Sequence, residues 1–398
     1  MPKALRDLLQ SEISYDEPDR MPAKITITNL DIILYCFAIV GHFVDLGLDL
    51  NVAVRYAVAN QMVEFGWTLA FILLPAFVNT AVSIRMYAQD KQQNTLSNEF
   101  TKSHWLRVVM LVFQLAPILR FYDALSYAIK SRRAERKQDP ATARLYYALM
   151  LKEDSDAALL RVFECFLEAA PQLVLQVSLL LRGDQQLTVH QSLSITSSLV
   201  SMSWCLASYQ RAVRFAQEDK LNMNWVGSAL QAVYHYLLSV SRVISISLIA
   251  YHFPYWTVLA CSIHILIMTA WIQIFEHPVF CSQNKFAELA FSLALGAVYL
   301  FTYILAVEGR TRYRYATYYT VCFCQNVACG LLWYFFVEDQ VRESPYFLLL
   351  LLLTVIPYVA GLVIMVVYYM FFHPKLRRGV RDVNITVSYK SEQADDVK

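Results

Sequence analysis

Charged residues are scarce in this sequence, and the common signatures of ATP-driven and hydrolytic enzymes are absent. Only 17% of the 398 residues are charged, whereas soluble proteins carry about a quarter, so a water-facing surface would lack polar cover. No glycine precedes a lysine, which excludes a P-loop, and neither His-Glu-x-x-His nor Gly-x-Ser-x-Gly occurs. The net charge of +2 gives no reason to expect a nucleic-acid partner. We therefore expect a non-enzymatic protein with no cofactor and no metal.

Apolar residues are what the sequence has in abundance. They make up 57% of the chain, and the mean hydropathy is +0.39. A helix that crosses a membrane needs about 20 mostly apolar residues. Ten runs approach or exceed this length: 27–57, 65–87, 104–129, 157–182, 187–209, 224–252, 254–275, 286–307, 313–337 and 345–372. They predict an all-α polytopic membrane protein with one membrane domain at 25–373, between a tail at 1–24 and a tail at 374–398.

The distribution of Lys and Arg predicts which segments face the cytosol, because basic residues are retained on that side. The basic segments are 130–155, 210–220 and the C-terminal tail. If all ten runs crossed the membrane and the N-terminus were cytosolic, the first two of these segments would lie outside. All three lie in the cytosol, with both termini, if two runs enter the membrane and return without crossing.

The runs 104–129 and 313–337 are the best candidates for such re-entrant segments. The first contains Arg120 and Asp123, which are tolerable at membrane depth only when protein or a cavity surrounds them. The second is flanked by charged residues. The sequence thus predicts eight transmembrane helices, two re-entrant helical segments and a cytosolic basic loop at 130–155. This topology leaves one conflict with the charge rule, since it places three arginines outside: Arg310, Arg312 and Arg314.

Polar residues follow helical spacing on three of the predicted spans, since positions three or four apart share one face of a helix. The first span has Asp31, Tyr35, His42, Asp45 and Asp49. The run 157–182 has Arg161, Glu164, Glu168, Gln172 and Gln176, which extend over about 22 Å of helix at 1.5 Å per residue. The run 224–252 has Asn224, Ser228, Gln231, His235, Ser239, Arg242 and Ser245.

These residues must face one another or water, because each charge at mid-membrane costs about 2.5–3.5 kcal/mol on insertion scales. A closed network that only locks helices together is one explanation. A path for a polar substrate is the other, and stripes along the depth of three helices favour it. The candidate path residues are Asp31, Asp45, Asp49, Arg161, Glu164, Glu168, Gln172, Gln176, His235 and Arg242.

A phospholipid headgroup is a substrate that suits such a path. Its phosphate fits Arg161 and Arg242, and its ammonium fits the acidic residues, while its tails remain in the hydrocarbon. An ion pore more often shows rings of one charge sign or a carbonyl filter. A secondary transporter, an ion channel and a non-scrambling adaptor that binds a lipid-transfer protein or receptor remain alternatives.

Two motifs resemble those of the XK-related family. Residues 44–50, Val-Asp-Leu-Gly-Leu-Asp-Leu, resemble its Asp-x-Gly-x-Asp signature, and 166–176, Phe-Leu-Glu-Ala-Ala-Pro-Gln-Leu-Val-Leu-Gln, are similar to its most recognisable run. The likeness covers about residues 25–375. It implies eight spans, two re-entrant segments and two pseudo-symmetric halves, and we note a four-residue match between 165–168 and 322–325 that hints at an inverted repeat.

The resemblance also implies a function, which is ATP-independent phospholipid scrambling at the plasma membrane, with phosphatidylserine exposed in apoptotic cells. It gives headgroup-carrying roles to Asp45, Asp49 and Glu168. It implies membrane phospholipids as substrates, and a single-span chaperone subunit or a lipid-transfer protein as partners; a homo-oligomer is a further option. The resemblance further implies activation by a caspase cut in the cytosolic tail, as in several members of the family. Here only Asp395 in the tail and Asp19 near the N-terminus offer weak caspase sites.

Overall fold

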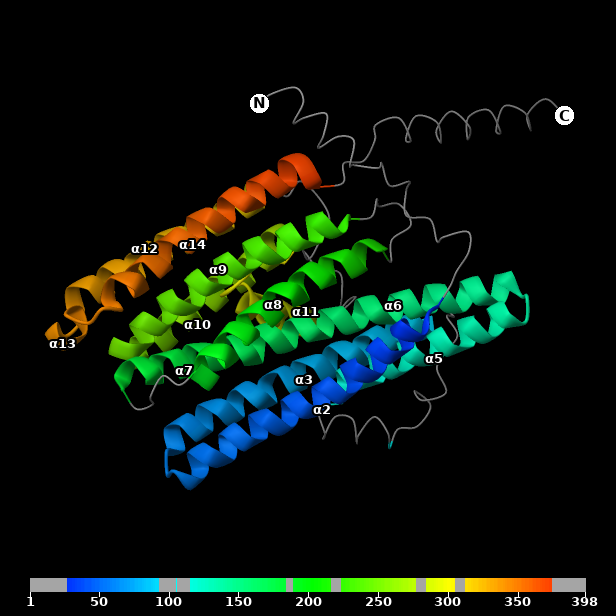
Figure 1. Cartoon of the computed structure of the whole chain (residues 1–398), viewed down its shortest axis with the longest axis horizontal. Coiled ribbons are helices and arrows are strands. Elements are labelled where there is room, and N and C mark those ends of the chain that lie inside the picture. The colour runs from blue at the N-terminus through cyan, green and yellow to red at the C-terminus, as the bar shows by residue number, and fades with distance from the viewer. Residues whose placement is uncertain are drawn as a thin grey trace.

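The computed structural model describes residues 27–92, 105, 115–183, 189–215, 223–276, 284–304 and 312–373, and every regular element in these ranges is a helix. The long helices lie side by side in one bundle (Figure 1). In chain order they are α2 (Asn29–Val58), α3 (Met62–Gln92), α5 (Ala116–Arg136), α6 (Pro140–Glu164), η2 (Cys165–Ala169), α7 (Ala170–Arg182), α8 (Val189–Phe215), α9 (Trp225–His252), α10 (Pro254–Trp271), η3 (Ile272–Glu276), α11 (Lys285–Val298), α12 (Arg312–Phe336), α13 (Asp339–Arg342), α14 (Phe347–Val367) and η5 (Tyr368–Phe372).

Among the described helices, six are long and apolar enough to cross a membrane: α2, α3, α9, α10 with η3, α12, and α14 with η5. The continuous α6–η2–α7 unit and α8 are similarly long but carry many more polar residues. The chain is therefore an all-helical, multi-pass membrane protein, which confirms the coarse prediction from hydropathy.

Side-chain contacts define the two ends of the bundle. At the first, which we call the basic end, Arg214 on α8 lies 3.2 Å from His373 after η5, and Arg314 on α12 donates a hydrogen bond to a carbonyl of η3. At the second, the distal end, Arg182 on α7 donates to the Ala250 carbonyl on α9. The basic end lies to the right in Figure 1 and the distal end to the left.

The basic segment 130–155, which the sequence predicts to connect membrane segments on the cytosolic side, is helical except at 137–139. Helices α5 and α6 form a hairpin that extends past the other helices at the basic end (Figure 1). Asp139 caps α6 by accepting a hydrogen bond from the Thr142 N–H at 3.1 Å, and Pro140 takes the first helical position, where its missing N–H costs nothing. Hydrogen bonds from the Thr142 hydroxyl and, next, from its backbone N–H hold the pKa of the Asp139 carboxyl below its usual range.

Helix α11 enters the bundle from the basic end and stops part-way. Near its start, Gln273 of η3 donates to the Glu288 carbonyl at 3.3 Å, and just after its end the Tyr299 carbonyl lies 3.1 Å from His264 in the middle of α10. The chain then returns, because the Tyr303 hydroxyl donates to Glu276 at the end of η3. With 14 residues, α11 is about 21 Å long, shorter than the hydrocarbon core of about 30 Å.

The prediction that 313–337 is re-entrant is wrong, because α12 runs the full height of the bundle. It begins beside η3 at the basic end, through Arg314, and ends where the Phe336 ring lies 5.5 Å from that of Phe253 at the distal end. The charges around its start misled the prediction. Arg314 lies at the same end as the other basic segments, so the conflict with the charge rule disappears for this residue.

The described elements divide into two halves of similar order. Helices α2, α3, α5, α6–α7 and α8 are followed by α9, α10, α11, α12 and α14. Both α2 and α9 begin at the basic end, so the halves run in the same direction, and the hint of an inverted repeat was wrong. The largest apolar core lies around α9, which packs against α7, α8, α12 and α14.

Candidate functional site

A groove of about 470 Å³ lies between α2, the α6–η2–α7 unit and α8. Its α2 wall extends from Phe37 to Val52, which is about 22 Å of helix. The polar side chains that line it are His42, Asp45 and Asp49 from α2; Arg161, Glu164, Glu168, Gln172 and Gln176 from α6–η2–α7; and Ser194, Ser197, Ser198 and Ser201 from α8.

The α6–α7 wall owes its continuous polar face to a π-helical turn at Cys165–Ala169. Pro171 follows this turn; it has no N–H to donate, and its ring would clash with the carbonyl four residues earlier in a regular helix. A π turn relieves that conflict. Because the turn is wider than an α turn, it brings Glu164 and Glu168 closer to a single line along the helix.

Charges of both signs meet in the middle of the groove. His42 Nδ1 lies 3.0 Å from Glu164 Oε1, so α2 and α6 are joined across the space. One turn further along α2, Asp45 interacts electrostatically with Glu164 and Arg161. Since the side chains of Asp45 and Arg161 are both exposed, a ligand in the groove meets a carboxylate and a guanidinium together.

A second acidic pair lies further along the same walls, toward the distal end. Asp49 is within hydrogen-bonding reach of Glu168 and Gln172. Two carboxyl groups at this separation need a shared proton, a cation or water between them, because both cannot stay charged and unscreened. Gln172 is 9% exposed and lines the groove beside this acidic pair.

The third wall, on α8, was missed by sequence reasoning, which found polar stripes on three other runs. Ser194, Ser197 and Ser201 are exposed and line the groove. Their spacing of three and four residues was the signal that could have found them. Apolar side chains line the same groove, since Phe37 is 68% and Leu48 57% exposed. The groove thus offers a polar floor and an apolar rim.

Comparison with known proteins identifies the kind of protein that has this groove. The profile of the family described as XK-related protein matches residues 33–374. Two curated relatives are each named Cell death abnormality protein 8. The one from Caenorhabditis elegans is 26% identical over 382 residues, which cover 90% of this chain and 82% of the relative. The one from Caenorhabditis briggsae is 26% identical over 388 residues, which cover 92% and 83%. The chain belongs to the XK-related family.

In this XK-related protein, three of the predicted path residues lie away from the groove. Asp31 is part of a capping box at the start of α2, where the Thr28 N–H donates to Asp31 Oδ2 at 2.8 Å and the Asp31 N–H donates to Thr28 Oγ1 at 3.3 Å. His235 is buried between α8 and α9, with the Gln210 amide 3.5 Å from its ring. The stripe on the first span therefore combines a helix cap with groove residues.

Arg242 is the third of these residues, and it holds the chain just after α11. Its guanidinium donates to the Leu300 carbonyl at 2.8 Å and 3.0 Å and to Asn326 Oδ1 at 2.8 Å. Only 3% of the residue is exposed. These contacts enclose Arg242 in the second half of the bundle, away from the groove, and its role in a lipid path stays a prediction.

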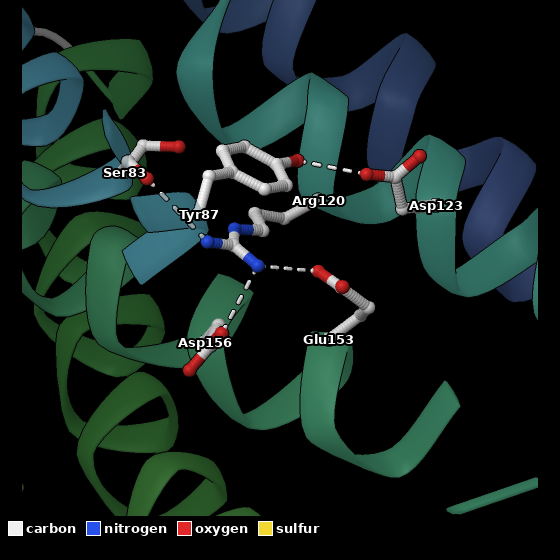
Figure 2. A network of polar contacts seen from close by, with 6 residues as sticks. All are labelled: Ser83, Tyr87, Arg120, Asp123, Glu153 and Asp156. Carbon is white, nitrogen blue, oxygen red and sulfur yellow. Dashed lines mark hydrogen bonds and ion pairs between the residues drawn. The ribbon is translucent and has the colours of Figure 1, made fainter. Parts of the chain in front are cut away.

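A buried ion cluster next to the groove joins α3, α5 and α6 (Figure 2). Arg120 on α5 contacts Glu153 Oε2 at 2.7 Å and Asp156 Oδ2 at 3.1 Å, both on α6. Its guanidinium stacks 3.7 Å from the ring centre of Tyr87 on α3, whose hydroxyl donates to Asp123 at 2.8 Å. Sequence reasoning placed Arg120 and Asp123 in a re-entrant segment but did not find their partners.

The cluster positions one wall of the groove. Phe121, the neighbour of Arg120, lines the groove beside the α6 residues. Since Arg120 is fully buried and Glu153 nearly so, the cluster fixes the depth at which α5 packs on α6.

The weak caspase candidates Asp19 and Asp395 lie outside the described residues, and within the described ranges no group of three or more His, Cys, Asp or Glu is placed to hold a metal ion.

Proposed function

We propose that this XK-related protein is an ATP-independent phospholipid scramblase, which moves lipids such as phosphatidylserine between the leaflets of the plasma membrane. The observation that carries the proposal is the groove of about 470 Å³, which presents charges of both signs on a face open to the outside of the bundle. The family membership and the names of the relatives, which refer to cell death, support a role during apoptosis.

Different groove residues bind the two charged groups of the phospholipid headgroup. Arg161 binds the phosphate, because a guanidinium presents planar pairs of donors to phosphate oxygens. Asp45 and Glu164 bind the ammonium that lies a few atoms away on the same headgroup. The acyl chains remain outside, against the apolar rim that Phe37 and Leu48 contribute.

The energetic case rests on desolvation. A charge carried through the hydrocarbon centre costs about 2.5–3.5 kcal/mol on insertion scales and more in simulations. Partners of opposite charge along the groove offset this cost at each step, so the headgroup moves without chemical energy. Lipid can therefore move in either direction, and its net movement follows its own concentration gradient. This agrees with the lack of a P-loop motif.

The topology that follows has eight crossings and two re-entrant segments. The crossings are α2, α3, α6–η2–α7, α8, α9, α10–η3, α12 and α14–η5, while the chains that contain α5 and α11 enter and return. The basic end faces the cytosol, because the arginines and lysines of the α5–α6 hairpin lie there. Both termini are then cytosolic, and a single-span chaperone or a lipid-transfer protein docks on the assembled bundle.

The test is a lipid-movement assay with purified protein in liposomes. A fluorescent headgroup-labelled phospholipid is placed in both leaflets, and an impermeant quencher reports the fraction that reaches the outer leaflet. We expect nearly complete quenching without ATP, against about half in protein-free liposomes. Lipid that stays in place in full-length protein and in protein lacking 1–24 and 374–398 would refute scrambling and favour the adaptor. Ion flux without lipid movement would favour a channel.

A further inference from the structure

A second, smaller cavity of about 290 Å³ lies between α6, α8 and α9, and the proposed path above does not use it. We call it the α8–α9 pocket. It is lined by Asp154 on α6, Trp204 and Arg211 on α8, and Trp225 at the start of α9. Its position near the end of α8 and the start of α9 places it toward the basic end. Its volume is close to the lower limit of ligand pockets, about 300 Å³.

Arg211 is held rigidly in the wall of this pocket. Its guanidinium carbon lies 4.2 Å from the centre of the Trp225 ring, and its NH1 group donates to the Met223 carbonyl at 2.8 Å and to Ser228 Oγ at 3.4 Å. A guanidinium fixed in this manner loses little conformational freedom when it binds an anion. Among anions, a phosphate matches its planar set of donors well.

Asp154 supplies the opposite charge from the facing wall. Its carboxylate accepts one hydrogen bond, from the Tyr35 hydroxyl at 3.4 Å, and it forms no ion pair with a cationic side chain in the described part of the chain. A carboxylate that is partly removed from water and lacks a counter-charge is costly. An ammonium group in the pocket supplies that counter-charge.

The pocket continues the groove along two helices. On α6, Asp154 and Arg161 lie seven residues apart, and on α8, Ser194, Ser201 and Ser208 follow at the same interval. Seven residues are close to two turns of an α-helix, so on each of these two helices the residues lie along one face. From Asp154 to Gln176 the polar residues of the α6–η2–α7 unit cover about 33 Å of helix, whereas the groove row from Arg161 to Gln176 covers about 22 Å. Only the longer row matches a hydrocarbon core of about 30 Å.

We propose that the α8–α9 pocket binds the headgroup of a zwitterionic phospholipid, with its phosphate on Arg211 and its ammonium near Asp154. The exposed rings of Trp204 and Trp225 lie at the level of the glycerol backbone, where indole rings are favoured. The pocket is then the place where a lipid of the basic-end leaflet enters the groove. This last step rests on the proposed scrambling function, whereas the binding itself does not.

Photo-crosslinking measures the binding separately from lipid movement. A benzophenone amino acid replaces Leu151, which lines the pocket but carries no charge, and the full-length protein is placed in nanodiscs that contain phosphatidylethanolamine with an alkyne on its acyl chain. Illumination is expected to attach this lipid to the protein. Asp154→Asn and Arg211→Gln should each lower the yield about tenfold, the change expected from one lost hydrogen bond between charged groups.

Matched controls remove the same charges elsewhere at the basic end. Asp139→Asn keeps a residue that can cap α6, and Arg133→Gln removes an exposed guanidinium on α5; neither should change the yield. Should Arg211→Gln fail to give monodisperse protein, the isosteric Asp154→Asn carries the test. An equal crosslinking yield in wild type, Asp154→Asn and Arg211→Gln would refute headgroup binding in the pocket.

The two proposals fail in different ways in this design. If wild-type protein crosslinks the lipid with the expected charge dependence but moves no lipid in liposomes, the pocket stands and scrambling fails. If it moves lipid but shows no charge-dependent crosslinking at the pocket, scrambling stands and the pocket is refuted. Slower scrambling in Asp154→Asn together with lost crosslinking supports entry through the pocket.

Discussion

His42 Nδ1 on α2 lies 3.0 Å from Glu164 Oε1 on α6, and this contact crosses the middle of the groove. In the proposed lipid path, this carboxylate lies where the ammonium of the headgroup passes. Two features of the site follow from it: the walls are held at a fixed separation, and the negative charge is shared between a protein partner and the ligand.

Replacing Glu164 by Gln tests the second feature, because the amide keeps the shape and the contact with His42 while the charge is lost. We expect scrambling to slow about tenfold, since one charge-assisted contact is worth about 1.5 kcal/mol or more. The rate is measured as headgroup quenching in liposomes at equal protein density. Glu135→Gln on the α5–α6 hairpin is the control, and an equal rate in both variants would remove Glu164 from the path.

Arg161 offers a test of the phosphate role. Arg161→Gln should slow scrambling of all phospholipids about tenfold, because each carries a phosphate that loses its charged partner. Arg161→Lys should restore part of the rate, since a lysine keeps the charge but not the planar pair of donors. A rate unchanged in Arg161→Gln would mean that this guanidinium only balances Asp45 and Glu164.

The Arg120 cluster predicts an effect on stability (Figure 2). Arg120→Met leaves Glu153 and Asp156 without their shared cation, and breaking a buried ion pair costs about 3–5 kcal/mol. The variant should therefore unfold at a clearly lower temperature in detergent than wild type. Adding Glu153→Gln should recover part of the loss, because one of the unpaired charges is removed. A single variant as stable as wild type would show that the cluster is not structural.

A substitution at Arg242 should lower the stability of the protein without slowing lipid movement. In Arg242→Lys a single ammonium must serve both the Leu300 carbonyl and Asn326, which the guanidinium contacts at once. The melting temperature should fall, while the scrambling rate of the protein that remains folded should match wild type. If the rate falls while the melting temperature does not, Arg242 belongs to the lipid path after all.

Hydropathy predicted the helices well, because a membrane span needs a long apolar run whatever its neighbours are. The run 224–252 is α9 at 225–252, and 27–57 is α2 at 29–58. Helical spacing also predicted the α6–α7 wall, since Glu164, Glu168 and Gln172 are each four residues apart. Spacing within one helix is a local property, so a sequence records it directly.

Partners across helices were harder to predict. Arg242 fits the stripe of its own helix, but a tertiary contact directs it to the Leu300 carbonyl just after α11. Asp31 also fits a stripe, but it belongs to a local capping box with Thr28. The choice of 313–337 as re-entrant failed because charge next to an apolar run does not reveal its depth; the short length of α11 does, and it emerges only when the chain folds back at Tyr299. The α8 serines were overlooked because small polar residues also serve helix packing.

The most direct test of the central claim is a reversible block of the groove. Ser197→Cys places a thiol on the exposed α8 wall, and Thr196→Cys places one on the same helix outside the groove lining. We expect a bulky methanethiosulfonate reagent to stop lipid movement in liposomes with Ser197→Cys, a reducing agent to restore it, and Thr196→Cys to keep the wild-type rate throughout. Lipid movement that continues unchanged through the fully modified Ser197→Cys protein would show that headgroups do not travel along this groove.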